Sequence, residues 1–189
     1  MILIPYNTQR IYEPSVITVG SFDGVHLGHQ ALFQEMNNYA KKHNYKSVVV
    51  TFNPHPQEVL QNIPGFFLIN NFEQILLLFE KFGIDTVFSI PFSKEFSQKN
   101  AIDFLEEDIL LQINTKAVFM GPYHHFGKQR EGDAGTLSVI CKEKNIDLIT
   151  TQEFKVNGVG VRSTLIRKYL AQHDRQSAEK LMGHNVYCG

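Results

Sequence analysis

The chain has no tryptophan and only two cysteines, Cys141 and Cys188, among its 189 residues. These cysteines lie far apart and lack metal-ligand spacing, so the sequence offers no cysteine-based zinc motif. Reduced thiols of a cytoplasmic protein explain them better than a disulfide does. No apolar run is long enough to span a bilayer, and residues 1–5 lack the basic flank and the length of a signal peptide. We therefore expect a cytoplasmic protein with no membrane partner.

The chain also has little net charge, with a formal value of −1 at pH 7. A protein without a global basic field is not expected to bind nucleic acid. The length of 189 residues suits one domain with a sizeable core, and no linker or internal repeat divides the chain. We therefore treat residues 1–189 as a single domain.

Two common phosphate-binding motifs are missing from the turn after the first expected strand. The turn has neither the Gly-x-Gly-x-x-Gly of dinucleotide-binding proteins nor the Gly-Lys-Ser/Thr of a P-loop. It contains His26 and His29 on either side of Gly28, whose missing Cβ would let a bulky ligand approach the backbone. At a helix start, these imidazoles would share one face near free N–H groups and the positive end of the helix dipole. The sequence thus predicts an anion site, with a surface helix cap as the alternative.

Short apolar segments alternate with amphipathic segments along the rest of the chain. The expected strands cover residues 16–19, 47–52, 86–90, 117–120 and 147–150, and the expected helices cover residues 28–43, 71–82, 99–112 and 133–144. Strands that are apolar throughout are typical of a parallel sheet buried on both faces. The pattern predicts an α/β, Rossmann-like fold with a mostly parallel sheet flanked by helices. The pair Asn157-Gly158 predicts a hairpin near the end of the chain.

A proline-rich loop, Asn53-Pro54-His55-Pro56, directly follows the strand expected at residues 47–52. Ligand crevices in folds of this class lie at the carboxyl ends of the strands. The prolines stiffen the loop and hold Asn53 and His55 extended, so an amide and an imidazole would be directed reproducibly at a ligand. A turn that merely ends a strand is the alternative.

The segment from Ser163 to Arg167 is expected to begin a helix, with Ser163 or Thr164 as its cap and Arg167 one turn later. Hydroxyls, N–H groups and a guanidinium at one helix start would form a second anion clamp, and an ordinary capped helix is the alternative. Asp23 is the carboxylate nearest to the first clamp. It either helps to hold Mg²⁺, which would be bound mainly by phosphate oxygens and water, or only orders the turn.

Several long motifs occur in one order along nearly the whole chain. They are Gly-Ser-Phe-Asp-Gly-Val-His-Leu-Gly-His at 20–29, Thr-Phe-Asn-Pro-His-Pro at 51–56, a helical insertion at 91–105, a loop at 121–133, and Val-Arg-Ser-Thr-Leu-Ile-Arg at 161–167. Together they resemble the adenylyltransferase module of the bacterial bifunctional riboflavin kinase/FAD synthetase, a branch of the nucleotidylyltransferase superfamily. Residues 170–189 resemble the connection to that family's kinase domain. We expect the riboflavin kinase domain to be absent, because the chain stops where its β-barrel would start.

The resemblance implies FMN adenylyltransferase activity, in which ATP and FMN react by in-line nucleotidyl transfer to give FAD and pyrophosphate. It implies Mg²⁺ bound with ATP as the cofactor, and we expect no metal site made by protein side chains alone. The implied catalytic residues are His26, His29 and Arg167. The implied ATP- and phosphate-binding residues are Gly20, Phe22, Asp23, Gly28, Ser163, Thr164 and Arg167. The implied flavin-binding residues are Asn53, Pro54, His55, Pro56 and Tyr123.

Two positions depart from the pattern of that family. Tyr123 stands where the family has an acidic residue or Asn, and Arg162 replaces the first Ser of a pair. These departures motivate one alternative, a non-catalytic flavin- or nucleotide-binding module. A nucleotidyltransferase for another small phosphorylated acceptor is a second alternative, against which the motif at residues 53–56 argues, because it resembles that of the FAD synthetase branch.

Overall fold

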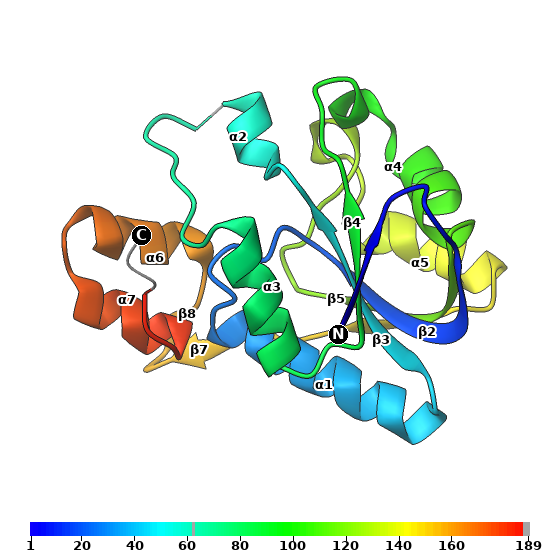
Figure 1. The fold of residues 1–189 in the computed structure, drawn as a ribbon, viewed down its shortest axis with the longest axis horizontal. Coiled ribbons are helices and arrows are strands. Elements are labelled where there is room, and N and C mark those ends of the chain that lie inside the picture. The colour runs from blue at the N-terminus through cyan, green and yellow to red at the C-terminus, as the bar shows by residue number, and fades with distance from the viewer. Residues whose placement is uncertain (62, 187–189) are drawn as a thin grey trace.

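The computed structural model describes residues 1–61 and 63–186 and contains a six-stranded sheet (Figure 1). All neighbouring strands are parallel, in the order β1-β4-β3-β2-β5-β6. The strands are β1 (Ile2–Pro5), β2 (Ile11–Val19), β3 (Lys46–Phe52), β4 (Thr86–Ile90), β5 (Ile113–Met120) and β6 (Asp147–Thr150). The expected α/β, Rossmann-like architecture with a parallel sheet is confirmed.

Helices cover both faces of the sheet. On one face lie α1 (Leu27–His43) and α3 (Phe72–Lys81), and on the other lie α4 (Ala101–Asp103), the π-helix η2 (Phe104–Leu110) and α5 (Ala134–Glu143). Successive residues of β2 show this division, since Val16 packs in the core under α1 and α3 while Ile17 packs in the other core. Both side chains are fully buried, as expected for a strand covered on both sides.

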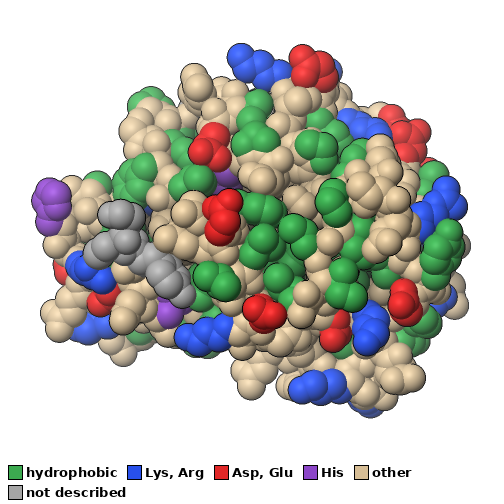
Figure 2. Space-filling model, viewed as in Figure 1, with side chains coloured by type: hydrophobic (Ala, Val, Ile, Leu, Met, Phe, Trp, Pro, Cys, Tyr) green, Lys and Arg blue, Asp and Glu red, His purple; other side chains and the backbone are tan. Residues whose placement is uncertain are grey.

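The sequence pattern missed β1, the edge strand. Its sequence is apolar but only four residues long, and Ile2 and Leu3 are 60% and 43% exposed. Figure 2 shows apolar side chains gathered over the middle of the face where β1 and α3 lie. The helix expected at residues 99–112 is shorter and consists of α4 followed by η2.

The last part of the chain forms a group of short elements beside the sheet, drawn in orange and red in Figure 1. They are the hairpin of β7 (Lys155–Val156) and β8 (Val159–Gly160), then α6 (Ser163–Ala171) and α7 (Arg175–Met182). Asn157 and Gly158 have φ angles of 51° and 80°, as a tight hairpin turn requires, so the predicted hairpin is confirmed. A third apolar core joins Ile166 and Met182 to Leu27 and thereby fastens α6 and α7 to the start of α1.

Cys141 of α5 is buried and has a free thiol. Burial raises the pKa of this thiol to about 11, so it stays protonated at neutral pH. Cys188 lies outside the described residues. Within the described part of the chain, no helix combines the length and the apolar character needed to cross a membrane.

Candidate functional site

His26 and His29 lie where the turn after β2 opens helix α1. Their rings stack, with centroids 3.6 Å apart and planes inclined by 16°. The backbone N–H of His29 donates to Nδ1 of His26 at 3.3 Å, so His26 caps the helix. A neutral imidazole whose Nδ1 accepts carries its proton on Nε2, which leaves that N–H to donate to a ligand. Capping and anion binding are therefore compatible in His26.

Both imidazoles are held in the neutral form. Burial is the main cause that lowers the pKa of His26 to about 4, with Arg167 as a further cause. Burial also lowers the pKa of His29 well below its ordinary value, and the neighbouring His26 adds to this effect. Among the described residues, the buried Nδ1 of His29 has no hydrogen-bond partner. An unpaired buried polar atom is costly, so it is the kind of group that a ligand would satisfy.

Phe22 supports the histidine pair. Its buried ring meets the His29 ring edge-on, with 5.1 Å between the centroids. Gly20 makes room for this ring, because a Cβ there would lie 3.0 Å from it. A Cβ on Gly28 would lie 3.2 Å from the His26 ring. The sequence suggested that a ligand would approach the backbone at Gly28, but the His26 ring occupies this space. The missing Cβ of Gly28 therefore makes room for the His26 ring.

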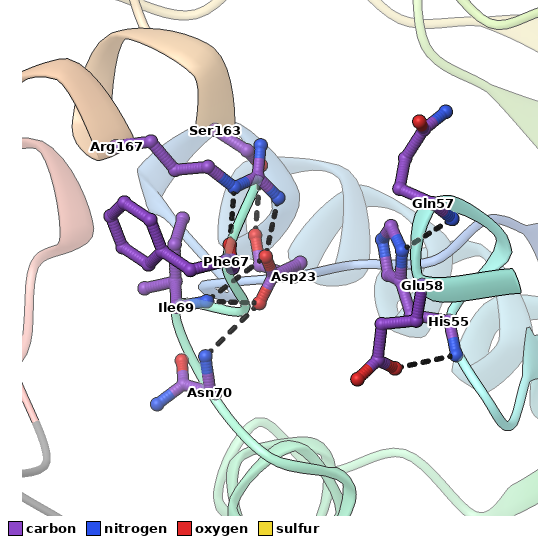
Figure 3. Close-up of polar contacts among 9 residues, drawn as sticks. All are labelled: Asp23, His55, Gln57, Glu58, Phe67, Ile69, Asn70, Ser163 and Arg167. Carbon is purple, nitrogen blue, oxygen red and sulfur yellow. Dashed lines mark hydrogen bonds and ion pairs between the residues drawn. The ribbon is translucent and has the colours of Figure 1, made fainter. Parts of the chain in front are cut away.

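Asp23 is only 2% exposed, yet its carboxylate has several partners (Figure 3). The backbone N–H groups of Ile69 and Asn70 donate to Oδ1, each at 3.0 Å, and the guanidinium of Arg167 contacts Oδ2. A carboxylate this deeply buried requires such partners. Of the two roles left open by the sequence, this geometry favours ordering of the turn over binding of Mg²⁺.

Two contacts tie the start of α6 to the turn that carries the histidines. Nε of Arg167 donates to the backbone carbonyl of Phe67 at 2.8 Å, next to the ion pair with Asp23. The Ser163 hydroxyl donates to the backbone carbonyl of Asp23, also at 2.8 Å. The two anion clamps expected from the sequence are therefore adjacent. A guanidinium carries more N–H donors than these contacts use, so Arg167 keeps the capacity to bind a phosphate.

The predicted cap of α6 is wrong. The N-cap is Arg162, whose side chain makes no hydrogen bond to the helix, and Ser163 is the first helical residue. Ser163 cannot serve as the cap because its hydroxyl is committed to Asp23, and Thr164 lies inside the first turn. The N–H groups at the start of α6 thus have no side-chain cap, an arrangement that favours a bound anion.

The proline-rich loop places His55 at the start of a short helix, α2 (Pro56–Leu60), that the sequence did not predict. The backbone N–H of Gln57 donates to Nδ1 of His55 at 3.0 Å, and the His55 N–H donates to the Glu58 carboxylate. Figure 3 shows this group beside the pair formed by Asp23 and Arg167. Burial is the main cause that lowers the pKa of His55, while Asp23 raises it and Arg167 lowers it. These electrostatic effects indicate that the proline-rich loop and the pair of Asp23 and Arg167 are close in space.

The two departures from the family pattern contact each other. The guanidinium carbon of Arg162 lies 4.1 Å from the centroid of the Tyr123 ring. Arg162 also forms an ion pair with Glu153 at 2.8 Å. The Glu153 carboxylate lies against Gly160, where a Cβ would come within 2.2 Å of it. Tyr123, Arg162 and Glu153 therefore form one unit between the loop after β5 and the start of α6.

Sequence reasoning missed two residues of this region, Phe66 and Glu153. The Phe66 ring contacts both His55 and Arg167, and Glu153 holds Arg162. Neither residue belongs to a recognisable motif, so no local signal in the sequence could have identified them.

Comparison with known proteins identifies a family and several relatives. The family model described as FAD synthetase matches residues 8–165. The bifunctional riboflavin kinase/FMN adenylyltransferase of Escherichia coli K12 is 32% identical over 177 residues, which cover 94% of this chain and 56% of that protein. The FAD synthetase of Listeria monocytogenes is 29% identical over 175 residues, or 92% of this chain and 70% of that protein. The chain thus spans little more than half the length of the bifunctional relative.

Two solved structures share the fold. A protein from Streptococcus pneumoniae described as a macrolide-efflux protein superposes with a TM-score of 0.86 and 26% identity, over 98% of this chain and 61% of that one. A pantoate-beta-alanine ligase from Francisella tularensis superposes with a TM-score of 0.55 over 97% of this chain and 78% of that one, and at 15% identity it shows the fold alone.

A parallel α/β sheet with a stacked histidine pair at one helix start and an uncapped helix start beside it defines a Rossmann-like protein with a candidate anion site. Within that class, the family model covers most of the sequence. The chain belongs to the FAD synthetase family.

Proposed function

We propose that this chain is an FMN adenylyltransferase, which makes FAD and pyrophosphate from ATP and FMN. The observation that carries the proposal is the neutral His26–His29 stack at the start of α1, with the uncapped start of α6 next to it. The names of the relatives, FMN adenylyltransferase and FAD synthetase, support the choice of substrates.

The reaction requires no protein nucleophile, because the 5′-phosphate of FMN is itself one. A phosphate oxygen of FMN forms a bond to the α-phosphorus of ATP while the bond from this phosphorus to the α–β bridging oxygen breaks. Pyrophosphate leaves with that oxygen. The protein then has to align the two phosphates and offset the developing negative charge.

The residues of the site divide this work. The Nε2–H of His26 and the His29 ring donate to oxygens at the reacting phosphorus and the leaving group. Backbone N–H groups at the start of α6, with Ser163, Thr164 and Arg167, hold the β- and γ-phosphates. The loop from Asn53 to Pro56 binds the FMN side.

Mg²⁺ enters this scheme with ATP. Within the described residues, no group of three or more His, Cys, Asp or Glu side chains is placed to hold a metal ion. The carboxylate of Asp23 is already hydrogen-bonded and ion-paired. The site therefore fits Mg²⁺ bound through phosphate oxygens and water, where the ion neutralises phosphate charge.

The test is to incubate the purified protein with ATP, Mg²⁺ and FMN and to measure FAD by chromatography and pyrophosphate by a coupled assay. Both products should appear together. FMN fluorescence quenching without FAD would replace the proposal with a non-catalytic binding module, which the departure at Tyr123 would then explain. Pyrophosphate release with nicotinamide mononucleotide or phosphopantetheine, but not with FMN, would assign a different acceptor.

A further inference from the structure

The Phe66 ring lies in the segment that links α2 to α3 and contacts one residue from each half of the site. Its centroid is 4.5 Å from the guanidinium carbon of Arg167 and 5.1 Å from the centroid of the His55 ring. The planes of the Phe66 and His55 rings are inclined by only 27°. A cation–π contact and a ring stack thus meet on one side chain.

The backbone that follows this ring is fixed to Arg167 and to Asp23 in the turn that carries the histidines. The carbonyl of Phe67 accepts from Arg167, and the N–H groups of Ile69 and Asn70 donate to Asp23. Gly65, just before Phe66, has a φ of +70°, where a side chain would be strained. These backbone contacts therefore fix the position of Phe66 relative to Asp23 and Arg167.

We propose that Phe66 is a positioning residue, which sets the distance between His55 on the FMN side and Arg167 on the ATP side so that the two phosphates meet in line. This inference rests on the proposed function. In-line transfer depends on the alignment of two bound substrates, and a displacement of about 1 Å can lower the rate about 100-fold. Each substrate bound alone does not require that alignment.

The test compares Phe66→Ala with Phe66→Tyr, which keeps the ring, and with Ile63→Ala, which truncates a side chain that is 45% exposed in the same segment. We expect Phe66→Ala to lower kcat for FAD formation by about 10- to 100-fold. The dissociation constants of FMN alone and of ATP alone should stay unchanged. Phe66→Tyr and Ile63→Ala should keep the wild-type kcat.

An independent readout follows the His55 ring by NMR. Burial lowers the pKa of His55, and the groups that act on it electrostatically are Asp23, Arg167 and Glu58. Removal of the Phe66 ring exposes the imidazole to water, so the His55 pKa should rise in Phe66→Ala and remain low in Phe66→Tyr. This measurement needs no turnover and tests the contact itself.

The outcomes separate the two proposals. If the wild-type protein makes no FAD, the proposed function fails, and the positioning role fails with it even where the NMR titration confirms the contact. If the wild type is active, the positioning role is overturned by an unchanged or higher kcat in Phe66→Ala, by an effect on KM alone, or by an equal loss in Ile63→Ala. Should Phe66→Ala not fold, Phe66→Leu keeps the apolar volume without the ring and must show the same loss of kcat.

Discussion

The ring of Tyr123 lies under the guanidinium of Arg162, with 4.1 Å between the ring centroid and the guanidinium carbon. Each residue departs from the family pattern, and the structure shows that the two departures form one contact. The same guanidinium also forms an ion pair with the carboxylate of Glu153. A change at Tyr123 should therefore act through Arg162 on the start of α6.

We expect Tyr123→Asp to lower activity, because the ring is lost and a second carboxylate competes with Glu153 for Arg162. A cation–π contact at an exposed site contributes about 0.5–1 kcal/mol, which corresponds to about a two- to fivefold rise in KM for ATP. Tyr123→Phe keeps the stack and should behave like the wild type. KM for ATP and KM for FMN are measured separately, and a lower KM for ATP in Tyr123→Asp would mean that the family's acidic residue is preferable here too.

We expect His29→Ala to lower kcat far more than it weakens FMN binding. Removal of one donor that acts on developing charge costs about 2.7–4 kcal/mol, or about 100- to 1000-fold in rate. Steady-state kinetics of FAD formation and FMN fluorescence quenching measure the two effects. His43→Ala is the matched control, because His43 stacks on Tyr39 at the other end of α1. Near-normal turnover in His29→Ala would limit this histidine to a structural role.

We expect Arg167→Ala to destabilise the fold by about 3–5 kcal/mol, because it leaves the buried Asp23 carboxylate without its counter-charge. Urea denaturation measures this loss as a lower midpoint at an unchanged slope. Lys144→Ala is the control, since Lys144 pairs with Glu106 at an exposed site and such a pair contributes about 0–1 kcal/mol. Equal midpoints for the two variants would show that Asp23 tolerates the loss of its partner.

Stability should fall as the pH drops below the ordinary histidine pKa. His26 has a pKa of about 4 in the folded protein, whereas the unfolded chain binds a proton near 6.5. The unfolded state therefore binds more protons between these values, so the free energy of unfolding decreases from pH 6.5 towards pH 4. His26→Asn keeps a side chain that can cap α1 and removes the titration, so its stability should depend less on pH over this window. Parallel pH profiles for the two proteins would contradict the burial of a neutral His26.

The sequence pattern predicted the strands with apolar runs and missed the edge strand β1. Strands β2 to β5 contain largely buried apolar runs, which could be recognised from the sequence pattern alone. The edge strand β6 was predicted as well, although none of its residues is buried. The edge strand β1 was missed although its sequence is apolar, because this run is only four residues long and three of the four residues are exposed.

The nearness of the turn after β2 and the loop after β3 was predictable, but the local bonding of each was not. Both segments follow neighbouring strands of a parallel sheet, so they lie at the same edge of that sheet. The commitment of Ser163 to the Asp23 carbonyl could not be predicted, since the two residues are 140 positions apart. The contacts of Phe66 with His55 and Arg167 could not be predicted either, because they also depend on tertiary packing.

The ion pair between Asp23 and Arg167 spans 144 positions of the chain. During synthesis from the N-terminus, Asp23 leaves the ribosome long before the guanidinium that neutralises it exists. The turn that carries Asp23 can therefore complete its native structure only after Arg167 has been made, whereas β2 and β3 beside it can pair earlier. Completion of the candidate site thus comes late relative to the pairing of these strands.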